Sequence, residues 1–118
     1  MDNQTTLSDL KEKIKYFSEE RDWDQYHNAK ELAIGIVTES SELLQHFRFK
    51  SEEQVDEMLE ERGEKLREEL ADVLYFVLRL AQRYDIDLST ELNNKLEKNA
   101  EKYPIEKAKG SNKKYSEF

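Results

Sequence analysis

The sequence predicts an all-α protein built as a four-helix bundle, and three observations support this prediction. Apolar residues recur at the three- and four-residue spacing of helices, and no stretch alternates apolar with polar residues as a strand does. Glycine and proline are scarce, with 3 Gly and 1 Pro in 118 residues, and the patterned apolar residues argue against disorder. The length suits one domain, which we expect to span residues 1–118 with a basic tail from about 105–118.

The first two helices are predicted from their capping residues and their apolar spacing. A first helix over about 8–21 begins with Ser8 as N-cap. A second helix runs from Asn28, in a capping box with Glu31, to about residue 46. The apolar residues expected to face the core are Leu10, Ile14 and Phe17 in the first helix, and Leu32, Ile36, Leu43 and Phe47 in the second.

The second half of the chain predicts an acidic helical segment, a long helix and a last helix. Ser51 caps the acidic segment, and Gly63 is expected to break or kink the chain before the long helix, which ends near Tyr84. Asp87 caps the last helix, which Pro104 ends, and the tail beyond it is expected to be mobile. The expected core residues are Leu66, Leu70, Val73, Val77 and Tyr84 in the long helix, and Leu88, Leu92 and Leu96 in the last.

Composition excludes several classes of function. A net charge of −8 argues against an extended surface for DNA, RNA or anionic membranes, because such surfaces need clustered Lys and Arg. The absence of cysteine excludes disulfides and thiolate metal sites. No signal-peptide-like segment and no apolar run of about 20 residues is present, so we expect a cytoplasmic protein that contacts no membrane.

Two carboxylate pairs interrupt apolar helical segments. Glu39 and Glu42 lie within AIGIVTESSELL, and Glu69 and Asp72 lie at the start of EELADVLYFVLRLA. Residues three apart share one face of a helix, so antiparallel packing of the two helices would make four carboxylates converge. Carboxylates in such a place need a positive partner, and all-oxygen ligands favour Mg²⁺ or Mn²⁺ over Zn²⁺.

The competing interpretation is that these pairs are structural, since a chain with 27 acidic residues has such spacings by chance. Most acidic spacings are solvated faces. That interpretation is the one expected for a group of acidic residues outside the apolar segments, namely Glu52, Glu53, Glu57, Glu60, Glu61 and Glu64.

Besides the carboxylate pairs, five sequence blocks carry a family resemblance: RDWDQYH, TESSELLQHFRFK, EELADVLYF, KNAEKYP and KGSNKKY. With them the sequence resembles the MazG-like all-α nucleoside triphosphate pyrophosphohydrolases, and within that family the dCTP pyrophosphatase branch. The resemblance covers about residues 8–118. It implies hydrolysis of a (deoxy)nucleoside triphosphate, with dCTP or a modified dCTP favoured, to the monophosphate and pyrophosphate, as nucleotide-pool sanitation. It also implies dimers, often paired into tetramers, with sites shared between subunits. Apolar residues occur on several helix faces, such as Tyr75, Leu78 and Ile34, and some of them are expected between subunits.

Carried over residue by residue, the resemblance implies that Glu39, Glu42, Glu69 and Asp72 are the Mg²⁺ ligands and the catalytic residues. Either Glu39 or Glu42 would orient or deprotonate the attacking water. The residues that it implies for base and sugar, where stacking and hydrogen bonding are needed, are Trp23, Gln25, His27, Phe49, Phe76 and Asn99. Cationic candidates for the triphosphate, each with a solvated surface charge as the alternative, are Lys30, Lys50, Lys102, Lys109, Lys113 and Lys114.

Four departures from the family pattern leave the base preference open. Thr38 stands where many members have a further Glu, and Ile14 where a relative can have His. Phe49 replaces a frequent Trp, and Phe76 a frequent Tyr, which removes a hydroxyl from the expected pocket. A broader dNTP preference is therefore the alternative to dCTP. Other classes of function remain as well: a non-catalytic helical module that senses nucleotide or binds a protein, or a diphosphate-releasing enzyme acting on a nucleotide sugar or nucleoside diphosphate.

Overall fold

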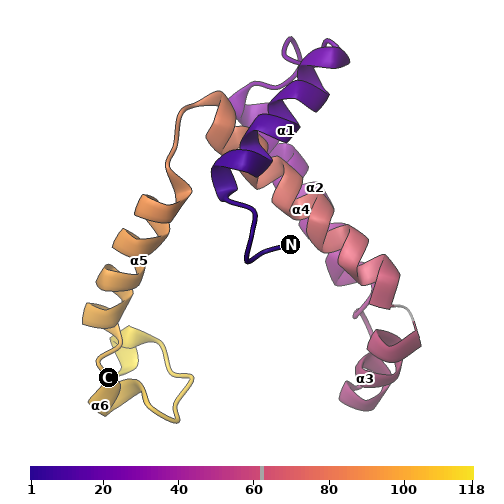
Figure 1. Cartoon of the computed structure of the whole chain (residues 1–118). Helices are drawn as coiled ribbons and strands as arrows, with labels where there is room; N and C mark the ends of the chain where they lie inside the picture. Colours follow the sequence, from indigo (N-terminus) through magenta and orange to yellow (C-terminus); the bar gives the residue numbers. More distant parts are fainter. Residues whose placement is uncertain (62) are drawn as a thin grey trace. The chain divides into compact units, whose positions relative to one another are not determined.

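The computed structural model describes residues 1–61 and 63–118, and within these ranges all regular secondary structure is helical, as predicted. The chain falls into two compact units, Met1–Asp85 and Ile86–Phe118. The first unit holds α1 (Leu7–Glu20), α2 (Ala29–Gln45), α3 (Glu52–Glu61) and α4 (Gly63–Arg83), and the second holds α5 (Leu88–Lys102), α6 (Ile105–Ala108) and the 3₁₀ turn η1 (Tyr115–Glu117) (Figure 1). The assignment of residues 1–118 to one functional domain stays a prediction.

The N-cap of α1 is Thr6, so the expectation of Ser8 in that role was wrong. The Asp9 backbone N–H donates to Thr6 Oγ1, and the Thr6 N–H donates to the Asp9 carboxylate, both at 3.0 Å. This reciprocal pair satisfies two otherwise unpaired helix-end N–H groups. A capping box that began at Ser8 would need an acceptor side chain at position 11, and Lys11 is a donor only.

The other predicted caps are confirmed. The Asn28 side chain accepts a hydrogen bond from the Glu31 N–H at 2.9 Å, and the Asp87 side chain accepts one from the Thr90 N–H at 2.9 Å. Ser51 precedes α3 in a capping box with Gln54, with bonds of 2.8 and 3.2 Å. The long helix α4 begins at Gly63, where a break was expected.

Helix α4 is the centre of the first unit, with α2 packed along it and α1 crossing it (Figure 1). The buried apolar residues of this unit are Leu32, Met58, Leu66, Leu78 and Ala81. Complete burial of one Leu side chain is worth about 1.5–3 kcal/mol, so this short list is a modest core.

Helix α1 is also joined to α4 by a hydrogen bond. Ser18 is fully buried; its hydroxyl donates to the Ile14 carbonyl at 2.8 Å and accepts from the Tyr75 hydroxyl at 2.9 Å. Tyr75 therefore faces α1. Leu78, only 1% exposed, belongs to the core, so the expectation that it lies on the surface between subunits was wrong.

Several other positions expected in the core are exposed. Leu70 is 56% exposed and Tyr84 47%, although the Tyr84 hydroxyl accepts from the Ala29 N–H at 2.8 Å. In α5, Leu92 is 61% exposed and Leu96 56%, so their assignment to a core was wrong for the chain by itself. Helical periodicity predicts which residues share a face of a helix, but it does not predict which part of that face another helix covers.

The segment after Pro104, expected to be a mobile tail, contains α6 and η1. Its aromatic rings pack on the end of α5: Tyr103 lies 6.1 Å from Tyr115 and 5.9 Å from Phe118, measured between ring centroids. The Lys102 ammonium lies 4.9 Å from the centre of the Tyr115 ring. The second unit is thus held together by an aromatic cluster of the tail with the end of α5.

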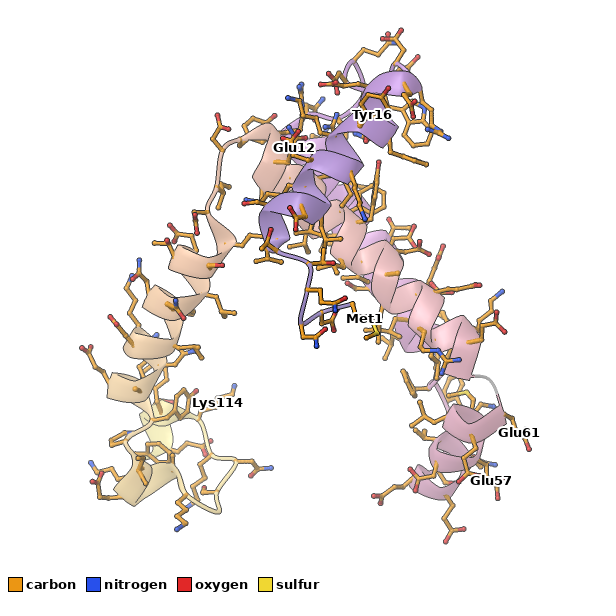
Figure 2. The ribbon with its side chains drawn as sticks, viewed as in Figure 1. Met1, Glu12, Tyr16, Glu57, Glu61 and Lys114 are labelled. Atoms are coloured by element: carbon orange, nitrogen blue, oxygen red, sulfur yellow. The ribbon has the colours of Figure 1, made fainter. Side chains whose placement is uncertain are left out.

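The acidic helix α3 and the hydropathy of the helices complete the description of the fold. Glu57 and Glu61 of α3 project away from their helix, in agreement with their interpretation as a solvated face (Figure 2). Among the described residues, no helix is both long enough and apolar enough to cross a membrane.

Candidate functional site

Three carboxylates meet where α2 packs along α4. Glu39 of α2 and Glu69 and Asp72 of α4 each offer an oxygen atom, and these atoms lie within 4.8 Å of one another. We call these three residues the acidic triad. The packing of the two helices therefore brings together three of the four carboxylates that the sequence singled out.

Glu42, the fourth, is exposed and lies outside the triad, but it interacts with Glu39. Burial raises the pKa of the Glu39 carboxyl, and the hydrogen bond and negative charge of Glu42 raise it further. The charges of Asp72 and Glu69 act in the same direction. The site is thus a cluster of like charges that disfavours the ionisation of Glu39.

Glu69 shows that this cluster fits a cation. Its Oε2 atom is buried and has no hydrogen-bond partner among the described residues, whereas its Oε1 lies 3.4 Å from His46 Nε2. A buried carboxylate oxygen without a partner is costly. His46 can offset one charge at most, and only when protonated, so a hard divalent cation with oxygen ligands suits these residues.

His46, the C-cap of α2, lies beside Glu69 and was not among the predicted site residues. It also borders a cavity of about 450 Å³ lined by His46, Glu61, Glu64, Lys65 and Glu68. His46 follows Glu42 by four residues, a spacing that places two side chains on the same face of a helix. This spacing was the signal that could have assigned His46 to the site.

Phe76 lies one turn beyond Asp72 and packs against α2 at Gly35. A Cβ atom at position 35 would lie 2.5 Å from two carbons of the Phe76 ring. Gly35 thus permits a close approach, and the approaching group is an aromatic ring in the turn that follows the triad.

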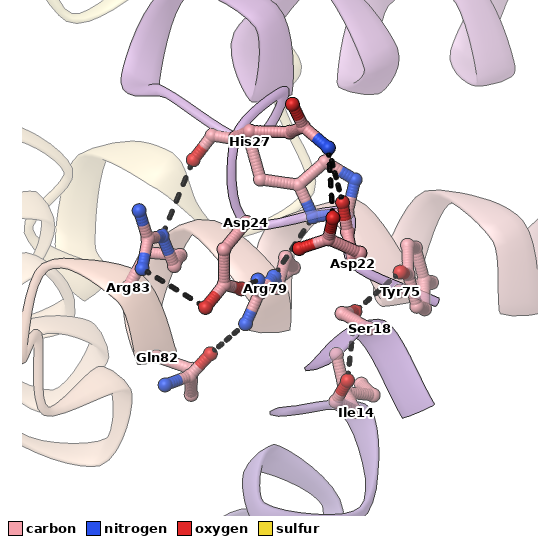
Figure 3. Close-up of polar contacts among 10 residues, drawn as sticks. Ile14, Ser18, Asp22, Asp24, His27, Tyr75, Arg79, Gln82 and Arg83 are labelled. Atoms are coloured by element: carbon pink, nitrogen blue, oxygen red, sulfur yellow. Dashed lines mark hydrogen bonds and ion pairs between the residues drawn. The ribbon is translucent and has the colours of Figure 1, made fainter. Parts of the chain in front are cut away.

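The loop of residues 21–27, here called the aromatic loop, is held on α4 by Arg79 (Figure 3). Arg79 is fully buried; its Nε donates to His27 Nδ1 at 2.9 Å, and its other nitrogens bond to Asp24 and Gln82. Arg83 donates to the His27 carbonyl at 3.3 Å and pairs with Asp24 at 3.7 Å. Sequence reasoning missed Arg79, although a charged residue within the apolar run VLYFVLRLA was the same signal that singled out Asp72.

The predicted nucleotide residues in this loop make contacts within the first unit. Trp23 is 37% exposed, and its ring centroid lies 5.7 Å from that of Phe17 and 5.9 Å from that of His27. The Gln25 amide donates to the backbone carbonyl of Asp22 at 3.0 Å and to its carboxylate at 3.1 Å, so in this structure it stabilises the loop. Burial lowers the pKa of His27, and Arg79 lowers it further.

The remaining predicted residues are divided between the two units. Phe49 is 92% exposed with φ 60°, and the Arg48 guanidinium lies 4.7 Å from its ring centre. Lys50 is exposed, and Lys30 borders an apolar groove of about 360 Å³ on α2 with Ala33, Ile34, Val37 and Thr38. Asn99, Lys102 and Lys109 belong to the second unit. Their roles stay predictions.

A family model described as the MazG-like family matches residues 34–118, which include the acidic triad. The chain belongs to the MazG-like family. As a MazG-like protein it is 34% identical over 115 residues to dCTP pyrophosphatase 1 of Rattus norvegicus, a match that covers 96% of this chain and 68% of the relative. It is 32% identical over 118 residues to dCTP pyrophosphatase 1 of Bos taurus, covering 98% and 70%.

The MazG-like fold is also found in a solved structure. A pyrophosphatase from Archaeoglobus fulgidus superposes with a TM-score of 0.79 and 37% sequence identity, over 82% of this chain and 91% of that chain. The predicted resemblance and fold class are thereby confirmed. The family-model match begins within α2, whereas the matches to the dCTP pyrophosphatases span nearly the whole chain.

Proposed function

We propose that the protein is a nucleoside triphosphate pyrophosphohydrolase that removes nucleotides from the cellular pool. It converts a (deoxy)nucleoside triphosphate and water to the monophosphate and pyrophosphate. This proposal rests on the acidic triad of a MazG-like chain and on Glu69 Oε2, which has no hydrogen-bond partner in the described part of the chain. Relatives named dCTP pyrophosphatase 1 and a similar structure named a pyrophosphatase support the reaction class.

The favoured substrate is dCTP or a modified dCTP. The names of the relatives support this choice, and aromatic surfaces at Trp23 and Phe76 suit a base and a sugar. Phe76 has no hydroxyl to read a polar group, so a broader dNTP preference is the alternative. His27, Phe49 and Asn99 remain candidates for base and sugar, and Lys30, Lys50, Lys102 and Lys109 for the phosphates.

Magnesium, with manganese as a substitute, is the proposed metal. Glu39, Glu69 and Asp72 would hold it with help from Glu42, and the bound ion would supply charge stabilisation to the phosphate oxygens. A carboxylate of α2, Glu39 or Glu42, orients the attacking water and accepts its proton. The water oxygen then bonds to the α-phosphorus, the bond from that phosphorus to the bridging oxygen breaks, and pyrophosphate leaves.

A homodimer or homotetramer, with sites shared between subunits, is the proposed assembly. Large apolar side chains are exposed on three helices, namely Ile34, Val37, Leu44, Leu70, Leu74, Leu92 and Leu96. Large apolar side chains exposed in this number favour burial in a protein interface. Light scattering after size exclusion tests the assembly, and a monomer at micromolar concentration would contradict it. A cytoplasmic location stays a prediction.

The deciding experiment is a panel of canonical and modified dNTPs with Mg²⁺, with products resolved as monophosphate, diphosphate and pyrophosphate. We expect pyrophosphate from dCTP, lost in Glu39→Gln and in Asp72→Asn and retained in Glu57→Gln, whose carboxylate is exposed on α3. Full activity in the first two variants would contradict the metal assignment. Nucleotide binding without products would indicate a non-catalytic sensing module instead, and products from nucleotide sugars or diphosphates would indicate a different substrate class.

A further inference from the structure

Arg79 is a charged residue that is fully buried in the apolar stretch of α4. A guanidinium in such a place is costly to desolvate, and the cost is offset only when its donors are satisfied. Here its three nitrogen atoms all have partners: His27, Gln82 and Asp24 (Figure 3). The partners His27 and Asp24 belong to the aromatic loop.

The bond from Arg79 to His27 determines where the imidazole proton is. A guanidinium is always protonated and offers donors only, so His27 Nδ1, 2.9 Å from Arg79 Nε, must be the acceptor. An imidazole that accepts at Nδ1 carries its proton on Nε2 and has no net charge. Among the described residues, Nε2 makes no hydrogen bond, so its N–H is available to a ligand.

The surroundings of His27 lower the pKa of its ring on balance. Arg79 and Arg83 on α4 and Asp24 in the loop are the charged groups with a resolved influence on the ring. Burial lowers the pKa of His27 most; the two arginines lower it further, and Asp24 opposes them. The neutral ring that the Arg79 hydrogen bond requires is therefore also the form that its surroundings favour.

We propose that Arg79 is a positioning residue that holds His27 of the aromatic loop as a neutral Nε2–H donor, which meets the nucleotide as a hydrogen-bond donor to an acceptor atom and not as a cation. This inference rests on the proposed function for its ligand. Anchoring alone would not require it, because Arg83 already bonds to the His27 carbonyl and pairs with Asp24. The additional bond to Nδ1 is what selects the tautomer.

The first measurement is of the ring itself and needs no nucleotide. The chain has 2 His, so ¹⁵N-labelled imidazoles give two sets of signals, and His46→Gln assigns them. We expect His27 as the Nε2–H tautomer in the wild-type protein. Arg79→Met should remove this preference and let the ring titrate at a higher pH. Arg83→Gln removes a charge that also lowers the pKa of the ring, but it leaves the bond to Nδ1 in place and should keep the tautomer. An Nδ1–H tautomer in the wild-type protein, or no change in Arg79→Met, overturns the proposal.

The second measurement links the tautomer to the ligand. The loss of one oriented hydrogen bond predicts that Arg79→Met raises KM for the nucleotide by roughly 2- to 10-fold with a smaller change in kcat. Met can fill the buried position, and Asp24, whose side chain is 40% exposed, can be hydrated, so we expect the variant to fold. If it does not, the wild-type tautomer still tests the proposal. If Arg79→Met folds, shows an altered tautomer and keeps an unchanged KM, the positioning role is overturned. If the wild-type protein hydrolyses no nucleotide, the proposed function is overturned and the tautomer result still stands.

Discussion

Gly35 and Phe76 lie so close together that α2 has no room for a side chain at position 35: a Cβ atom there would lie 2.5 Å from the Phe76 ring. Glycine inside a helix costs roughly 1 kcal/mol relative to alanine. The close contact explains why glycine is present despite this cost: the missing side chain lets an aromatic ring lie between the helices that carry the acidic triad. The position of Phe76 is therefore determined by a residue that has no side chain.

Gly35→Ala should displace the Phe76 ring and raise KM for the preferred nucleotide. The new Cβ improves helix propensity by about 1 kcal/mol, but overpacking costs about 1–3 kcal/mol, so we expect no gain in stability. Gly63→Ala is the matched control, because its Cβ would meet only the flexible guanidinium of Arg67, at 3.0 Å. Steady-state kinetics and thermal unfolding of both variants test this, and an unchanged KM in Gly35→Ala would contradict it.

Glu39→Gln should make the metal-free protein more stable while it abolishes hydrolysis. The substitution removes a negative charge from a cluster in which Glu42, Asp72 and Glu69 all act on Glu39. We expect a higher melting temperature than wild type in a chelating buffer, and a lower one when Mg²⁺ is in excess. Glu57→Gln, at an exposed position of α3, should change neither. A lower melting temperature for Glu39→Gln in chelator would show that the carboxylate is stabilising without metal.

The metal-free stability should depend on pH through Glu39. The folded state raises the pKa of this carboxyl above its usual range, mainly by burial and by Glu42, so the folded protein binds this proton more tightly than the unfolded chain does. Its contribution is therefore fully present below the unfolded pKa and is lost as the pH rises through the folded pKa. Urea midpoints measured against pH in chelator should show this loss in wild type but not in Glu39→Gln. Parallel profiles for the two proteins would mean that Glu39 does not titrate in this way.

Asp24→Asn should destabilise the protein more than its partial exposure suggests. Its carboxylate is shared by Arg79 and Arg83, and its loss leaves a fully buried guanidinium without a counter-charge. The breaking of a fully buried pair costs roughly 3–5 kcal/mol, and the 40% exposure of the Asp24 side chain places the expected loss below that range. Asp22→Asn is the control, since Asp22 contributes only an exposed contact with Gln25 in the same loop. Chemical denaturation measures both, and equal effects would contradict this account of Arg79.

The helices and half of the site could be predicted because they depend on local spacing. Asn28 and Asp87 cap their own helices, and Glu69 and Asp72 share a face because they lie three residues apart. Leu92 was placed wrongly because a helical wheel gives a face but not a neighbour to cover it. The Arg79 network could not be predicted in the same way: its partners His27 and Asp24 lie 52 and 55 residues away in the sequence, and only tertiary packing brings them together.

Within residues 1–61 and 63–118, Glu69 Oε2 has no hydrogen-bond partner, so the folded state offers a cation a ligand that is not held in place in the unfolded chain. Ligand binding to the folded state alone adds stability as the logarithm of the free ligand concentration, about 1.4 kcal/mol for each tenfold increase above the dissociation constant. A plot of melting temperature against cation concentration therefore measures binding at this site. A series of melts over different cations would rank their affinities without any nucleotide present.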